Sequence, residues 1–363
     1  MPDGDSTASK VELLEQKLSA DWPAIRKARH DTASKREKLD ELFRERTSPD
    51  TSLVVFGSVA RQEVTSSSDL DWILLIDGPP APEHTEQALE IKRVLKDKQN
   101  IEPGGSGVFG GVVGSHPLVQ NIGGEDDLNS NTTRRVLLLL ESLPIGNPKA
   151  REAYDRVRRQ VLCRYLGDDR GLCNSSSEIR IPRFLLNDLT RYWRTVTVDF
   201  VYKQRAENDK KWALRNAKLR MSRKLVFAAG LLRCFFCHLD TAADDARQAL
   251  TSKKDVSPLT AYMERHLSLT PLDLVAKACL ERDDVRTETA RSIFDSYDQF
   301  LAILDDSVKC SELERVRTHE ELRRSKAWNE VRKVSHPFHE GLVNLFLSDD
   351  DDLKELTMQY GVF

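Results

Sequence analysis

Two aspartates in the first quarter of the chain, Asp69 and Asp71, have the residue type and spacing that suit metal chemistry. They open the apolar run 72–76, which is typical of a β-strand. Because side chains alternate between the two faces of a strand, both carboxylates are expected on one side, with Leu70 on the other. Carboxylates held this close repel one another unless a cation lies between them, and Mg²⁺ or Mn²⁺ prefers oxygen ligands. The pair therefore predicts a metal site.

A small-residue turn precedes the two aspartates and suits a phosphate group. The apolar run 53–56 ends at Gly57 and Ser58, and a polar interval leads from there to Asp69. Glycine allows close approach of the backbone to a ligand, and Ser58 is expected to begin a short helix whose free N–H groups favour phosphate. A phosphate-binding turn beside a metal site predicts a nucleoside triphosphate (NTP) as the substrate.

The motif Gly57-Ser58 followed by Asp69-x-Asp71 resembles the signature of the DNA polymerase β-like nucleotidyltransferase superfamily. In pattern it is most similar to the branch that contains the minimal nucleotidyltransferases and the PII-uridylyltransferase-like enzymes. The resemblance covers about residues 50–145. It implies transfer of a nucleoside monophosphate (NMP) to an acceptor hydroxyl with release of pyrophosphate, with both aspartates as catalytic metal ligands.

The arginine one helical turn after Ser58, Arg61, has two interpretations. It either contacts the triphosphate, as a nucleotide-binding residue, or forms an ion pair with Glu63 or Asp69 that fixes the turn.

Further cations are expected from the second half of the chain. In relatives of this superfamily that have a helical domain behind the sheet, lysines and arginines of those helices hold the triphosphate. The resemblance therefore implies that the basic helical stretch at 209–224 supplies such residues. The candidates for nucleotide binding are Lys218, Arg220 and Lys224. At α-helical spacing Arg220, Arg223 and Lys224 fall together on the surface, so a solvated basic face is the alternative interpretation.

The third carboxylate of polymerase β-like enzymes is missing from its usual place, because the strand expected at 108–113 contains no acid. Three interpretations stay open. Glu125, Asp126 or Asp127 could reach the metal from the following loop, with Asp127 as the candidate ligand. Alternatively, Asp69 and Asp71 hold a single nucleotide-bound Mg²⁺, or the site binds a nucleotide without turning it over. The simpler explanation of the loop is an acidic cap on the next helix.

The predicted fold class is α+β, with a small mixed sheet followed by an all-α region. The expected divisions are a helical segment at 1–47 that covers the sheet, a catalytic domain at 48–167, a helical domain at 178–345 and an acidic tail at 346–363. His336 and His339 flank Pro337 at an expected helix boundary. Cys234 and Cys237 continue an apolar helical run, so we expect buried thiols rather than a metal or redox pair.

The bulk properties limit the classes of partner. The net charge is −3, so any attraction to nucleic acid must be local, and DNA is not expected as a partner. The start of the chain lacks a basic and then apolar leader, and no apolar run is long enough for a membrane span. We therefore expect a cytoplasmic protein without a membrane partner.

The resemblance favours a protein side chain as acceptor. RNA or a second nucleotide is the alternative, supported by the basic and aromatic helices at 183–224, and a non-catalytic nucleotide-binding regulator is another.

Overall fold

A four-stranded mixed sheet forms the core of the first half of the chain in the computed structural model, which describes residues 8–46, 48–99, 108–174, 179–206, 211–281 and 287–361. The strand order is β3-β2-β1-β4. The strands are β1 (Thr51–Phe56), β2 (Asp71–Ile76), β3 (Val112–Gly114) and β4 (Ser142–Ile145). β1 pairs antiparallel with β2 and β4, whereas β2 pairs parallel with β3. The α+β class with a small mixed sheet is confirmed.

The third strand begins later than expected, at Val112 rather than at 108. Residues 108–111 form bends instead. Two hydrogen bonds still hold this segment to β2, because the Gly110 N–H donates to the Trp72 carbonyl at 2.7 Å and the Leu74 N–H donates to the Gly111 carbonyl at 3.0 Å. The preceding glycine-rich tract at 103–107 lies outside the described residues.

Nineteen α-helices and three short helices of other types surround and follow the sheet in the described part of the chain. Those around the sheet are α1 (Lys10–Leu18), α2 (Pro23–Leu42), α3 (Ser58–Arg61), α4 (Pro82–Gln99), α5 (Ser115–Gln120), α6 (Asn129–Leu140), α7 (Pro148–Gly167) and α8 (Arg170–Cys173). The helical half contains α9 (Arg183–Ala206), α10 (Trp212–Lys218), η1 (Leu219–Arg223), α11 (Lys224–Leu239), η2 (Thr241–Ala243), α12 (Asp244–Lys253), α13 (Ser257–Leu267), α14 (Pro271–Leu280), α15 (Thr287–Asp305), α16 (Ser307–Arg315), α17 (His319–Arg324), α18 (Lys326–Leu347), α19 (Asp351–Leu356) and η3 (Thr357–Gly361).

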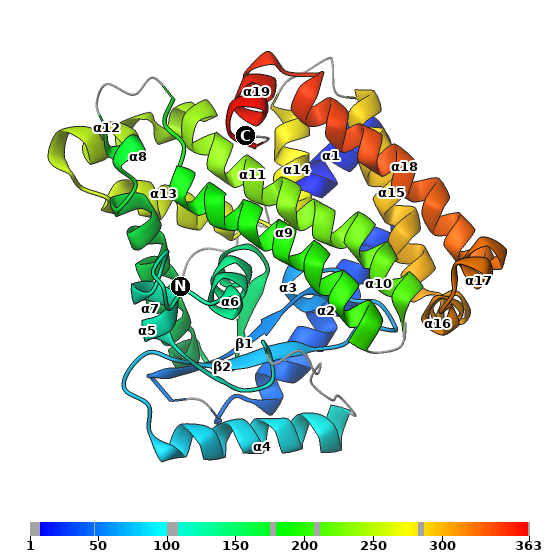
Figure 1. Cartoon of the computed structure of the whole chain (residues 1–363), viewed down its shortest axis with the longest axis horizontal. Coiled ribbons are helices and arrows are strands. Elements are labelled where there is room, and N and C mark those ends of the chain that lie inside the picture. The colour runs from blue at the N-terminus through cyan, green and yellow to red at the C-terminus, as the bar shows by residue number, and fades with distance from the viewer. Residues whose placement is uncertain are drawn as a thin grey trace.

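The two faces of the sheet contribute to two different hydrophobic cores, as the alternation of strand side chains requires. Leu53, Val55 and Trp72 belong to a small core that α4 and the end of α2 complete. Val54 and Ile73 belong to a much larger core that continues through α6 and α7 into the helical half. Figure 1 shows α4 on one side of the sheet and the helical half on the other. The sheet is therefore joined to the helical half through α6 and α7.

The N-terminal helices lie mainly against the helical half, whereas the sequence suggested that they cover the sheet. On α1, the Val11 N–H donates to Asp273 of α14 at 3.1 Å. Between α1 and α2, the Trp22 indole N–H donates to Asp295 of α15 at 2.7 Å. The end of this segment, with Leu39 and the following Phe43, packs in the small core of the sheet.

Two features of the C-terminal region differ in detail from expectation. Pro337 lies inside α18 rather than at a helix boundary. The acidic tail contains α19, whose Leu353 and Leu356 are buried.

Among the described helices none is by itself long and apolar enough to cross a membrane. The pair Trp212–Leu239 and Thr241–Lys253, bent by 70°, meets the length and composition requirements only when taken together. The apolar residues of α11 within that pair are buried in the large core.

Candidate active site

The turn between β1 and α3 forms one wall of a small pocket. Gly57 has φ +73°, a backbone conformation that residues with a Cβ rarely adopt, and it allows the chain to leave β1 and enter α3 at once. Phe56 is paired with Asp71 on β2, so the turn lies directly beside this aspartate. Gly57, Ser58, Asp69 and Asp71 all line the pocket. The structure thus brings together the four residues that the motif singled out.

The two aspartates face different surroundings within the pocket. Burial, and after it the neighbouring charge of Asp69, together raise the pKa of Asp71 to about 6. Asp69 lies at the mouth, with a side chain that is 74% exposed. Desolvation by the surrounding protein acts to raise the pKa of Asp69, but Lys218, a backbone hydrogen bond and Arg223 together outweigh it and hold that pKa below its ordinary value. Lys218 Nζ is 4.0 Å from Asp69 Oδ1.

The donor set of the pocket fits a divalent cation with oxygen ligands. Two carboxylates, one of them with a raised pKa, form a like-charge pair that a bound cation stabilises. A third carboxylate, Glu63, lines the same pocket, but it is 3% exposed and paired with Arg61, so the two aspartates make up the carboxylate donors. The pocket volume of about 50 Å³ leaves room for a cation with a few water molecules.

A buried ion-pair network supports the pocket from behind. Arg61 is 7% exposed, and its Nε lies 2.7 Å from Glu63 Oε2 while its Nη1 contacts Glu141. The second oxygen of Glu141 contacts Nη1 of Arg223 from the helical half. Glu141 immediately precedes β4, whose Ser142 pairs with Phe56, and this register places its side chain next to the turn. Of the two interpretations of Arg61, the structure therefore shows the ion pair with Glu63.

Glu141 and Arg223 are site residues that sequence reasoning missed. Burial acts to raise the pKa of Glu141, but Arg223 and Arg61 outweigh it and lower that pKa below its ordinary value. One signal was present in the sequence, because Glu141 directly follows the apolar run 136–140. A charged residue buried at the end of such a run needs a partner of opposite charge.

The helix formed by α10, η1 and α11 separates the predicted nucleotide-binding cations into two groups. Lys218 and Arg223 line the pocket. Arg220 lies over the Trp328 ring of α18, with its guanidinium carbon 5.6 Å from the ring centroid, and Lys224 Nζ lies 3.4 Å from His339 Nδ1 of the same helix. The prediction that Arg220 and Lys224 contribute to the nucleotide pocket is not met.

The local helix type explains this division. Residues 219–223 form a π-helical turn. In such a turn the hydrogen bonds join residues five apart, so Lys218 and Arg223 come to the same side. An α-helical period instead groups Arg223 with Arg220 and Lys224, which is the error in the sequence-based expectation.

Asp127 does not join the aspartate pair. Its side chain is 1% exposed and lies 2.8 Å from Arg135 Nη2 and 3.5 Å from Arg191 Nη1. It also accepts a hydrogen bond from the Gly123 N–H at 3.0 Å. Within the described ranges no group of three or more His, Cys, Asp and Glu side chains is arranged to hold a metal ion. The expected third ligand is therefore part of a structural ion-pair network, and it ties the loop at 121–128 to α6 and α9.

The helical half also positions the loop that carries Asp69. The Ser66 N–H donates to Asp305 Oδ1 at the end of α15, at 2.9 Å. Lys35 of α2 donates to the Ser68 carbonyl at 3.4 Å, and burial lowers the pKa of this lysine. Residues far apart in the sequence thus fix the conformation of the loop between α3 and β2.

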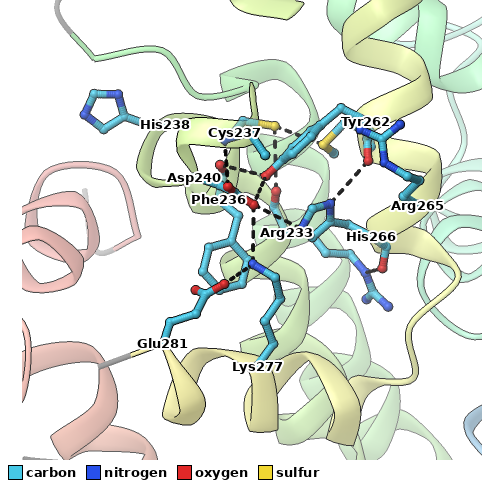
Figure 2. Close-up of polar contacts among 12 residues, drawn as sticks. Arg233, Phe236, Cys237, His238, Asp240, Tyr262, Arg265, His266, Lys277 and Glu281 are labelled. Carbon is cyan, nitrogen blue, oxygen red and sulfur yellow. Dashed lines mark hydrogen bonds and ion pairs between the residues drawn. The ribbon is translucent and has the colours of Figure 1, made fainter. Parts of the chain in front are cut away.

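A second polar cluster, partly buried, lies around the end of α11, at Asp240 (Figure 2). Its Oδ2 accepts a hydrogen bond from the Tyr262 hydroxyl at 3.0 Å and lies 3.4 Å from Lys277 Nζ. Nearby, Cys237 is buried, and burial raises its pKa to about 12. Cys234 and Cys237 are both fully buried and form no disulfide, so the expectation of buried thiols is confirmed. We interpret this cluster as a structural junction of α11, α13 and α14.

The fold and the pocket together combine a small mixed sheet with a Gly-Ser turn and an Asp-x-Asp strand. Residues 36–103 match the family model described as the nucleotidyltransferase domain, and this part of the chain is a nucleotidyltransferase domain of the polymerase β-like superfamily. The matched range contains Gly57, Ser58, Asp69 and Asp71. Neither a curated protein nor a solved structure gives a significant match to the chain.

Proposed function

We propose that this protein catalyses metal-dependent transfer of an NMP from an NTP to an acceptor hydroxyl, with release of pyrophosphate. In this reaction the acceptor oxygen forms a bond to the α-phosphorus while the bond from that phosphorus to the β-phosphate bridging oxygen breaks. The observation that carries the proposal is the pocket in which the Gly57-Ser58 turn, the Asp69–Asp71 pair and Lys218 meet.

The residues of the chain have separate roles in this proposal. Asp69 and Asp71 hold Mg²⁺ or Mn²⁺, which when bound neutralises phosphate charge and acts as a Lewis acid. Gly57 and Ser58 lie against the phosphates, and Lys218 at the mouth of the pocket contributes a positive charge toward them. Arg61 and Arg223 act as positioning residues, because Glu141 holds both of them.

The acceptor is the open part of the proposal. The resemblance to the PII-uridylyltransferase-like branch favours a protein side chain. A second candidate, RNA, is favoured by basic grooves beside α10 and α18, which are described below. The proposed location is the cytoplasm.

Labelled NTPs test the reaction directly. The protein is incubated with each of the four α-labelled NTPs and Mg²⁺ or Mn²⁺, together with total RNA or a protein lysate as acceptor. We expect pyrophosphate release and label in one acceptor fraction. Replacing Asp69 and Asp71 together by asparagine should abolish both signals.

The matched control replaces the two exposed acids of the loop at 121–128, Glu125→Gln with Asp126→Asn, and should keep activity. Full activity of the Asp69/Asp71 variant would refute the site assignment. If a nucleotide binds but no acceptor gives pyrophosphate release, the enzymatic proposal fails and the alternative of a non-catalytic nucleotide-binding regulator takes its place.

A further inference from the structure

We propose that two adjoining grooves beside α18 form an RNA-binding surface, in which Arg220, Arg323, Arg332 and Lys333 contact the phosphate backbone. This inference rests on the proposed function where it names RNA as the acceptor. The binding itself is a separate property that needs no turnover.

The grooves lie between α10, α17 and α18, on the right-hand side of Figure 1. The first is lined by Trp212, Asn216, Arg220, His319, Leu322, Arg323, Trp328 and Arg332. The second is lined by Arg220, Asn329, Arg332, Lys333, Ser335 and His336. They share Arg220 and Arg332, so they form one continuous depression.

The lining of this depression is positively charged and contains no carboxylate. Arg323, Arg332 and Lys333 are exposed, and none of them forms an ion pair with another described residue. The neighbouring Arg324, by contrast, is paired with Glu320 at 2.6 Å. In a protein with a net charge of −3, such unneutralised cations form a local attraction for a polyanion.

The acids nearest in sequence do not neutralise this depression. Glu330 of α18 is 2.7 Å from Lys309 of α16. Glu340 is 3.2 Å from the Nδ1 atom of His336, at one end of the second groove. The four permanent cations therefore dominate the surface.

The extent of the charged surface suits a polymer rather than a free nucleotide. Along α18 alone, the groove lining runs from Trp328 to His336, about 12 Å at about 1.5 Å per residue. Arg323 on α17 extends the charged surface beyond the start of α18. A nucleoside triphosphate concentrates its charge at one point, whereas a nucleic-acid strand distributes phosphates along such a length.

The type of cation favours RNA over an acidic peptide. Three of the four permanent cations are arginines, which bind phosphate through two parallel N–H groups and stack on bases with their planar faces. Arg220 is held over the ring of Trp328 and bonded to Asn216 at 2.9 Å, so its guanidinium is ordered before a ligand arrives. His319 and His336 add two further planar groups.

The depression also lies close to the active site. Arg220 and Lys218 project from opposite sides of one helix, toward α18 and toward Asp69 respectively. A helix with its side chains is about 10–12 Å across. RNA bound in the grooves is therefore separated from the aspartate pair by the thickness of this helix.

Fluorescence anisotropy with a labelled single-stranded RNA oligonucleotide, in the absence of NTP, tests the inference. We expect Arg332→Glu with Lys333→Glu to weaken binding by about tenfold or more and to reduce the slope of log affinity against log salt by about two. The matched control reverses two adjacent exposed cations on the far side of the sheet, Lys92→Glu with Arg93→Glu on α4, and should bind like the wild type. Thermal denaturation of both variants checks that they fold.

Three outcomes would overturn the inference. They are no RNA binding at low salt, equal loss of affinity in the two variants, and tighter binding of polyglutamate than of RNA at the same grooves. The two proposals fail separately. If RNA binding depends on Arg332 and Lys333 but no NMP transfer occurs, the RNA-binding surface stands and the proposed enzymatic function is refuted. If NMP transfer occurs but RNA binding is unchanged in the groove variant, the enzymatic function stands and the RNA-binding surface is refuted.

Discussion

Arg223 of the helical half donates to Glu141, the residue that immediately precedes strand β4. The other oxygen of Glu141 accepts a hydrogen bond from the Arg61 side chain. The backbone N–H of Arg61 donates in turn to the Gly57 carbonyl of the Gly57-Ser58 turn. One buried carboxylate thus connects the nucleotidyltransferase sheet with the helix that carries Lys218. The geometry of the pocket therefore depends on both halves of the chain.

Removing Glu141 should destabilise the protein strongly. Glu141→Ala leaves Arg61 and Arg223 without their shared counter-charge in a buried setting, and breaking a buried ion pair in this way costs about 3–5 kcal/mol. We expect the free energy of unfolding, measured by urea denaturation, to fall by about 3 kcal/mol. Glu320→Ala is the control, because it removes an exposed pair worth at most about 1 kcal/mol. Equal losses in the two variants would contradict the role of Glu141.

The same carboxylate predicts a pH dependence of stability. The pKa of Glu141 in the folded protein lies below the ordinary value of 4.5, so the unfolded chain takes up the proton first on acidification. Its stabilisation is therefore complete above about pH 4.5 and is lost as the pH falls through the folded pKa. The difference in unfolding free energy between the wild type and Glu141→Gln should be largest at neutral pH and should shrink below pH 4.5. A constant difference across this range would refute the ion-pair assignment.

Lys218 and Lys224 form a matched pair of lysines on the two sides of one helix. Lys218→Ala should raise the KM for NTP by about tenfold, because the charge beside Asp69 at the mouth of the pocket is lost. Lys224→Ala should leave this KM nearly unchanged, since its side chain contacts His339 on α18. Steady-state pyrophosphate release at varied NTP checks both. A larger effect of Lys224→Ala would reverse the assignment of the two faces.

Metal binding can be measured without turnover. Mn²⁺ should raise the Tm of the wild type, because a ligand that binds only the folded state stabilises it. Asp69→Asn with Asp71→Asn should abolish that shift while leaving the metal-free Tm equal or higher, since the like-charge repulsion is removed. The Asp127→Asn variant should keep the Mn²⁺ shift even if its Tm is lower, because Asp127 pairs with Arg135 and Arg191. If the Asp127→Asn variant lost the Mn²⁺-induced rise in Tm, Asp127 would have to be assigned as a metal ligand.

The local pattern of the sequence determined the centre of the site. Gly57, Ser58, Asp69 and Asp71 lie at the ends of two apolar runs, and strand alternation together with a tight turn suffices to predict that they face one pocket. The α+β class follows from the same pattern, because short apolar runs bounded by turn residues in the first half give way to helical spacing in the second.

Tertiary structure alone decided which charges complete the site. Asp127 and Glu141 are both acids near α6, yet Asp127 pairs with Arg135 and Glu141 pairs with Arg61 and Arg223. The partners of a buried charge are chosen by the packing of elements that lie far apart in the sequence, and residue spacing carries no information about that packing. The π-helical turn at 219–223 likewise brings Arg223 to the side of Lys218, because a change of hydrogen-bonding period rotates every later side chain relative to the α-helical expectation.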